Sequence, residues 1–180
     1  MKKIVIIGPE STGKSSLCTE LAGYFQGVCC PEYAREYLLA HGMHYTYEDL
    51  LTIARGQLDL EDKHASMTKD LSPSGHPAML FIDTDMYVMK VWCEFVFSNC
   101  HLWIMNQIAK REYDLYLLCN TDLPWVQDEL REYPDLETRE KLYHMYKDLM
   151  INQDTPWAEI SGNYEERIKR ARDAVRQWII

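Results

Sequence analysis

The sequence has no run of about 18 or more apolar residues, so no segment predicts a transmembrane helix. It also lacks the apolar stretch and small-residue cleavage site of a secretory signal, which favours a cytoplasmic protein. Positive charge is scarce, because 19 Lys and Arg residues stand against 28 Asp and Glu residues, for a formal charge of −9. Nucleic-acid-binding proteins need a basic surface, so neither nucleic acid nor a membrane is an expected partner.

Closely spaced cysteine pairs of the Cys-x-x-Cys type are missing as well. The six cysteines are scattered along the chain, at Cys18, Cys29, Cys30, Cys93, Cys100 and Cys119. This spacing excludes the common zinc and redox motifs. We therefore expect free thiols in a reducing compartment.

Short apolar segments alternate with longer amphipathic ones along the 180 residues. The apolar segments predict strands at residues 3–7, 28–30, 78–82, 115–119 and 157–160. Helices are expected after the first strand and at residues 32–41, 46–69, 86–110, 135–150 and from about 163 onward. Residues 72–77 are rich in turn-forming residues and predict a surface loop. This alternation predicts one α/β domain over residues 1–180, with a three-layer α/β/α fold and a five-stranded parallel sheet.

Three local patterns refine the predicted helices. Thr46 and Asn163 each precede an acidic residue by three positions, which is typical of a capping box at the start of a helix. In the C-terminal helix the expected buried face is Ile168, Ala171, Val175 and Trp178.

Residues 8–15 read Gly-Pro-Glu-Ser-Thr-Gly-Lys-Ser, a complete phosphate-binding loop between an apolar strand and an amphipathic helix. The glycines let backbone N–H groups curl around phosphate oxygens, and the helix dipole favours the same anion. Lys14 is expected to bind the β- and γ-phosphates, and the Ser15 hydroxyl to bind Mg²⁺. The residues predicted to hold ATP are Gly8, Glu10, Ser11, Thr12, Gly13, Lys14, Ser15 and Ser16.

Two carboxylates follow the third predicted strand, at Asp83 and Asp85. Residues two apart in an extended backbone project from the same face, so both side chains are expected in the ligand crevice beyond the strand ends. Asp83 is predicted to join the Mg²⁺ shell through water, and Asp85 to contact a substrate hydroxyl. The alternative for these carboxylates is that one merely caps the following helix, because Asp is a favoured N-cap residue.

Further charged residues follow the second and fourth strands. Glu32 is expected in the same crevice, and Arg35 lies one helical turn later, although a solvated surface ion pair is the alternative. Residues from about 122 to 140 are polar and predict a lid, on which Arg131 and Arg139 would stabilise a transferring phosphoryl group.

Three segments in order carry a resemblance to a known family. They are residues 8–15, residues 31–36 (Pro-Glu-Tyr-Ala-Arg-Glu) and residues 81–85 (Phe-Ile-Asp-Thr-Asp). Together they resemble the kinase domain of the bacterial NadR-type ribosylnicotinamide kinases, and residues 125–131 and 164–167 are similar to later segments of that family. The resemblance extends from the first strand to the last helix.

The resemblance implies ATP- and Mg²⁺-dependent phosphorylation of the 5′-hydroxyl of nicotinamide riboside, giving nicotinamide mononucleotide. It implies that Arg131 and Arg139 act from the lid, and it makes Trp92 or Tyr87 a candidate aromatic clamp for the nicotinamide ring. Trp92 in the core is the alternative. Met89 stands where a threonine is expected, which puts the acceptor in doubt. Fuller family members carry a DNA-binding module and an adenylyltransferase domain ahead of the kinase, and neither activity is expected here.

The leading hypothesis from the sequence is a small-molecule kinase with Lys14, Asp85, Glu32, Arg131 and Arg139 as catalytic residues. Either Asp85 or Glu32 would act as general base, and the sequence leaves that choice open. A second hypothesis keeps the fold and changes the acceptor to another nucleoside or a nucleotide. A third is an ATP-binding regulatory module with little turnover. The oligomeric state stays open.

Overall fold

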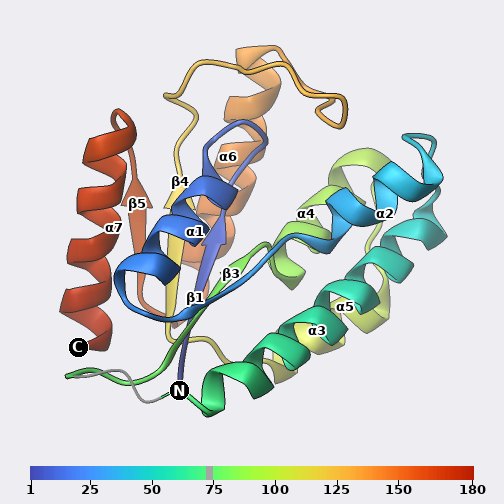
Figure 1. Ribbon diagram of the computed structural model, residues 1–180. Helices are drawn as coiled ribbons and strands as arrows, with labels where there is room; N and C mark the ends of the chain where they lie inside the picture. Colours follow the sequence, from blue (N-terminus) through green and yellow to red (C-terminus); the bar gives the residue numbers. More distant parts are fainter. Residues whose placement is uncertain (72–74) are drawn as a thin grey trace.

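The computed structural model describes residues 1–71 and 75–180, so the predicted loop at residues 72–77 lies partly outside the described residues. Within them, strands and helices alternate along the chain (Figure 1). The elements in order are β1 (Lys2–Ile7), α1 (Lys14–Tyr24), β2 (Val28–Cys30), α2 (Tyr33–His41), α3 (Tyr47–Lys69), β3 (Met79–Asp83), α4 (Met86–Phe97), α5 (Leu102–Lys110), β4 (Leu115–Cys119), α6 (Leu136–Ile151), β5 (Trp157–Ile160) and α7 (Tyr164–Ile179).

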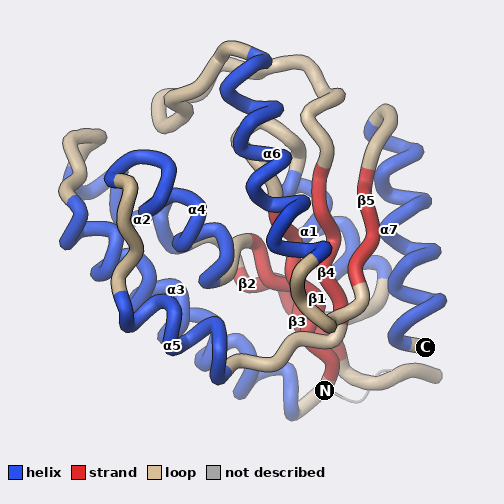
Figure 2. The backbone as a smooth tube through the Cα atoms, turned by 180° about the vertical axis from the view of Figure 1, so that it is seen from behind, coloured by secondary structure: helices blue, strands red, loops and turns tan. Residues whose placement is uncertain are grey.

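The five strands form one parallel sheet in the order β2-β3-β1-β4-β5 (Figure 2). β1 lies at its centre, with Ile6 opposite Asp83 on one side and Leu117 on the other. The chain crosses over a covering helix between parallel neighbours, as parallel strands require. The predicted five-stranded parallel sheet is therefore confirmed.

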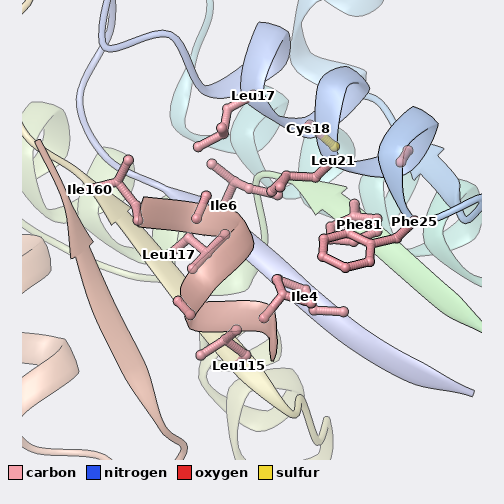
Figure 3. Packing of buried hydrophobic residues seen from close by; sticks show 14 of the residues in the cluster. Ile4, Ile6, Leu17, Cys18, Leu21, Phe25, Phe81, Leu115, Leu117 and Ile160 are labelled. Carbon is pink, nitrogen blue, oxygen red and sulfur yellow. The ribbon is translucent and has the colours of Figure 1, made fainter. Parts of the chain in front are cut away.

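The two faces of the sheet bury separate apolar clusters. Figure 3 shows the first cluster, in which Ile4, Ile6 and Phe81 pack against α1, with α7 completing it. On the other face Val5 and Ile7 pack under α3, α4 and α6. Successive strand residues point to opposite faces, so a sheet covered on both sides needs continuous apolar strands. The predicted three-layer α/β/α arrangement is confirmed.

A third apolar cluster lies among α2, α3, α4 and α5, beside the sheet. Its fully buried members include Ile53, Met89 and Ile104. These four helices form the part of the molecule to the right of the sheet in Figure 1. Two of them, α2 and α4, line the site described below.

Both predicted capping boxes are present. Thr46 Oγ1 accepts from Asp49 N while Asp49 Oδ2 accepts from Thr46 N, and Asn163 and Glu166 make the same reciprocal pair. Each box satisfies two backbone groups that the first helical turn leaves without a partner. These contacts fix where α3 and α7 begin.

Two predictions about the helices were wrong. The continuous helix expected at residues 86–110 is two helices, because Ser98 ends α4 in the left-handed conformation (φ 54°) and α5 begins only after His101. Trp178, expected on the buried face of α7, is 49% exposed. Ala174 packs against the sheet together with Ala171 and Val175. No helix in the described ranges is both long and apolar enough to cross a membrane.

Candidate active site

A cavity of about 320 Å³ opens beyond the carboxyl ends of the central strands. In open parallel sheets this is the edge at which ligands bind. Its lining includes the phosphate-binding loop, Glu32, Arg35, Asp83, Trp92 and Arg131. The structure thus brings together residues from five separate stretches of the chain.

The phosphate-binding loop takes a conformation that needs its glycines. Gly8 has φ 140°, and a Cβ there would lie 2.7 Å from the Cys119 carbonyl oxygen. Gly13 has φ 77° and sits at the N-cap of α1. Only glycine adopts such angles at low cost, so both positions exclude larger residues. The loop closes on itself through Thr12 Oγ1 and Lys14 Nζ, which both donate to the Pro9 carbonyl, at 2.7 and 2.9 Å.

Asp83 ends β3 with a side chain that is 2% exposed. Its Oδ1 has no hydrogen-bond partner within the described part of the chain. Burial raises the pKa of Asp83, while the charge of Lys14 and the hydroxyl of Ser15 act to lower it. A buried carboxylate oxygen without a partner is costly unless a ligand completes it.

Asp83 and Ser15 together offer the oxygen ligands that Mg²⁺ prefers. Among residues 1–71 and 75–180 no group of three or more His, Cys, Asp or Glu side chains is placed to hold a metal unaided. Magnesium bound to a nucleotide takes most of its ligands from phosphates and water. The donor set therefore fits the predicted metal.

Glu32 lies at the N-cap of α2 without capping it, and its side chain lines the cavity. Its Oε1 accepts a long hydrogen bond of 3.4 Å from the Thr84 hydroxyl. Burial raises the pKa of Glu32, and the negative charge of Asp83 raises it further. A carboxylate with a raised pKa in a cleft is a candidate for acid–base chemistry.

Asp85 does not share the cavity with Asp83, so the expectation that both side chains leave from one face was wrong. Thr84 between them has φ 80°, which ends the extended backbone on which that expectation depended. Asp85 Oδ1 accepts from Tyr87 N and Val88 N at the start of α4, and Oδ2 accepts from the Tyr116 hydroxyl at 2.8 Å. The carboxylate is 1% exposed, and burial raises its pKa to about 7. The geometry of Asp85 is that of a helix cap.

The segment between β4 and α6 passes over the phosphate-binding loop (Figure 1). Glu10 Oε2 accepts from the backbone N–H groups of Glu132 and Tyr133, at 2.9 and 3.3 Å. Ser11 Oγ accepts from Val126 N at 3.0 Å. Two side chains of the loop thus hold the predicted lid over it.

The two lid arginines lie in different surroundings. Arg131 lines the cavity, where its guanidinium donates to Ser11 Oγ at 3.5 Å and to the Val126 carbonyl. Arg139 belongs to α6, is 3% exposed and donates to the carbonyls of Thr121 and Leu123. The structure brings Arg131 to the phosphate end of the cavity and uses Arg139 to hold the chain that leaves β4.

Of the remaining predicted residues, two line the cavity and one does not. Arg35 reaches the cavity and pairs with Asp128 of the lid at 3.2 Å. Trp92 also lines the cavity, and its ring N–H donates to the Tyr45 hydroxyl at 2.9 Å. Tyr87 is absent from the described cavity lining and packs edge-on against Tyr116 at 5.7 Å.

Sequence reasoning missed the apolar wall of the cavity. The side chains that form it come from α4, α6 and the lid, namely Val88, Val91, Phe95, Leu142, Tyr146, Leu130 and Tyr133. Those on α4 and α6 recur at helical spacing, which also describes an ordinary core-facing helix. In the folded chain both helices reach the cavity, so part of this face becomes a candidate binding surface.

Arg167 lies in the segment at residues 164–167 that is similar to the family, and it contacts the phosphate-binding loop. It is 3% exposed and donates to the carbonyls of Thr12, Asn120 and Gly162, at 3.0, 2.9 and 2.8 Å. It also pairs with Asp122. One guanidinium therefore ties the phosphate-binding loop to the ends of β4 and β5.

The sequence of this chain is similar to those of known proteins over almost its whole length. NadR of Escherichia coli (strain K12), described as a trifunctional NAD biosynthesis/regulator protein, is 24% identical over 187 residues. The match covers 99% of this chain and 43% of that relative, and NadR of Salmonella typhimurium matches at the same values. The chain thus spans less than half the length of these relatives. The resemblance to NadR found in the sequence motifs is confirmed.

Solved structures match the fold. NadR in complex with NR superimposes with a TM-score of 0.78 at 22% identity, covering 99% of this chain and 50% of that one. NadR with NAD and AMP-PNP gives 0.74 at 23% identity, covering 98% and 49%, and thymidylate kinase from Candida albicans gives 0.65 at 13%, covering 98% and 91%.

A family model described as an AAA domain matches residues 3–167, from the first strand through Arg167. That stretch contains the phosphate-binding loop, the strand ends around it and the lid. On this match and on the geometry of the loop, the chain belongs to the AAA-domain family of P-loop proteins.

Proposed function

We propose that the chain is a single kinase domain that transfers the γ-phosphoryl group of ATP to the 5′-hydroxyl of nicotinamide riboside, giving nicotinamide mononucleotide. The observation that carries the proposal is the single cavity shared by the phosphate-binding loop, Asp83, Glu32 and an aromatic wall. The similarity to NadR, which was crystallised with NR and with AMP-PNP, supports both the acceptor and the donor.

In this mechanism Lys14 and the loop amides hold the ATP phosphates against the N-terminus of α1. Ser15 and Asp83 would hold Mg²⁺, which when bound neutralises charge on the phosphates. Arg131, already at the loop, stabilises the charge that spreads over the transferring group. The lid carried by Glu10 and Ser11 excludes water, so that hydrolysis does not compete with transfer.

Glu32 is the preferred general base between the two carboxylates. It lines the cavity, whereas both oxygens of Asp85 accept hydrogen bonds from α4 and Tyr116. A general base must come within hydrogen-bond reach of the acceptor hydroxyl, and geometry therefore favours Glu32. Trp92 and the apolar side chains of α4 offer a surface for a planar ring.

The test is ATP consumption with Mg²⁺ across a panel of nucleosides and nucleotides that includes nicotinamide riboside. We expect turnover with nicotinamide riboside to exceed that with every other acceptor. Higher turnover with another nucleoside or a nucleotide would keep the kinase and replace the acceptor. ATP binding without acceptor-dependent turnover would overturn the kinase proposal.

A further inference from the structure

Two of the six cysteines lie in sulfur–sulfur contact. Cys18 Sγ and Cys29 Sγ are 3.0 Å apart and share a hydrogen bond. Cys18 belongs to α1 and is fully buried, while Cys29 belongs to β2 and is partly exposed. A disulfide bond is about 2.05 Å long, so the two sulfur atoms need to approach by only about 1 Å to bond.

The surroundings of the two thiols give them different reactivity. The hydrogen bond from Cys18 lowers the pKa of Cys29, and the Thr19 hydroxyl lowers it further. The same contact and burial raise the pKa of Cys18. Burial raises the pKa of Cys30, Cys93 and Cys119 to about 12. The thiolate is the reactive form, so Cys29 is the thiol in this chain best suited to attack an oxidant.

We propose that Cys18 and Cys29 are a peroxide-reactive pair whose reversible disulfide joins the helix after the phosphate-binding loop to the strand before Glu32. Cys29 thiolate attacks one oxygen of hydrogen peroxide, the O–O bond breaks, and the released hydroxide takes a proton to leave as water. Cys18 sulfur then attacks the Cys29 sulfenic sulfur, the S–O bond breaks, and the leaving hydroxide takes the Cys18 proton as a second water. Two thiols lose two electrons to one peroxide.

The position of the pair couples the disulfide to the site. Cys18 lies one helical turn after Lys14, on the same side of α1, and Cys29 lies three residues before Glu32. Closing the gap by about 1 Å moves α1 toward β2, and the phosphate-binding loop moves with α1 because the two are continuous. This coupling rests on the proposed binding of ATP at the loop, whereas disulfide formation does not.

The experiment treats the whole chain with hydrogen peroxide and maps its thiols by mass spectrometry before and after dithiothreitol. We expect a mass loss of two hydrogen atoms, a single cross-linked peptide pair containing residues 18 and 29, and full reversal by dithiothreitol. Cys18→Ala and Cys29→Ala should each abolish the cross-link, and Cys100→Ala, a matched control at another partly exposed thiol, should keep it. Thermal melting checks that each variant is folded.

Mapping of the unsubstituted chain needs no variant, so it decides even where a variant fails to fold. Sulfinic acid at Cys29 without a cross-link, or a different cross-linked pair, would overturn the proposal. Titration with Mg-ATP tests the coupling, and the oxidised chain is expected to bind ATP about fivefold more weakly, the effect of one lost hydrogen bond. Equal affinity in a chain mapped as fully cross-linked would overturn the coupling, and it would do so without reference to turnover.

Discussion

The phosphate end of the cavity and its acceptor end are built in different ways. The phosphate end is nine consecutive residues, Gly8 to Ser16, whose backbone needs glycine at Gly8 and Gly13. The acceptor end takes Glu32 from the end of β2, an aromatic face from α4, another from α6, and the lid from the chain before α6. A short motif therefore specifies one end, and packing among distant elements specifies the other.

This difference predicts where substitutions act. At the phosphate end, replacing Lys14 should reduce ATP-dependent chemistry and leave the fold intact, because Lys14 lines the cavity and belongs to none of the apolar clusters. At the acceptor end the side chains also join helices to the sheet, so a change can act on chemistry, on stability or on lid position. The following tests separate these outcomes.

The largest effect is expected at the phosphate end, from Lys14→Ala. Lys14 is half-buried, and its only hydrogen bond within the described residues is to the Pro9 carbonyl. Loss of its charge should reduce ATP turnover by about 10³-fold, because electrostatic stabilisation of the phosphoryl group is the largest catalytic contribution at such sites. Steady-state turnover and thermal melting measure the effect. The matched control is Lys169→Ala, on the exposed side of α7, and turnover within tenfold of the unsubstituted chain would contradict the role of Lys14.

The next comparison sets Glu32→Gln against Asp85→Asn. As the proposed base, Glu32 should lose about 10²-fold in turnover on substitution, with little change in melting temperature. Asp85→Asn keeps an N-cap oxygen for α4 and is expected to leave turnover within about threefold. The two variants are compared by turnover at saturating ATP. If Asp85→Asn costs more turnover than Glu32→Gln, the assignment of the base reverses.

The lid contact is tested by Glu10→Gln. Glu10 Oε2 accepts two backbone N–H groups of the lid, and a neutral amide oxygen accepts such bonds more weakly than a carboxylate does. Hydrogen exchange at the amides of Glu132 and Tyr133 should become about tenfold faster, since each 1.4 kcal/mol of lost protection is a factor of about ten. Glu36→Gln, on the exposed side of α2, is the matched control. Unchanged exchange at both amides would mean that Glu10 does not hold the lid.

The smallest effect is a change in pH dependence at Asp85. Burial raises its folded pKa from 3.8 to about 7, so the folded state binds more protons than the unfolded state between these values. Asp85 therefore destabilises the fold progressively as pH rises from about 4 to about 7. Asn cannot titrate, so Asp85→Asn should flatten the curve of melting temperature against pH in this window. Parallel curves for the two proteins would contradict a raised pKa at this carboxyl.

Most of the secondary structure was predictable because its signals are local. Apolar runs located all five strands to within about one residue at each end, and capping boxes located the starts of α3 and α7. The break between α4 and α5 was missed, since the surrounding apolar residues continue a helical pattern across Ser98. Trp178 was misplaced because its spacing from Val175 fits the buried face, whereas at the end of α7 it is Ile179 that packs against the core.

Site residues were predictable where their position depends on neighbouring residues in the sequence. Glu32 and Asp83 were found from their places at strand ends, which topology brings to one edge of the sheet. Asp85 was expected beside Asp83 because residues two apart share a face in an extended backbone. The left-handed conformation of Thr84 breaks that pattern, and nothing in the sequence indicated it. The sequence predicted the same role for Arg131 and Arg139, as lid arginines. The folded chain distinguishes them by what each one contacts.

By itself, the sequence determined the succession of strands and helices along the chain, the position of the phosphate-binding loop and the helical layers that cover the sheet. Each of these depends on neighbouring residues, through backbone angles, caps and periodicity. Tertiary structure alone decided which carboxylate faces the cavity, which arginine reaches the loop, and that Cys18 meets Cys29. Most of these contacts join residues that lie on different helices, strands or loops. Only the packing of those elements against one another brings such side chains together.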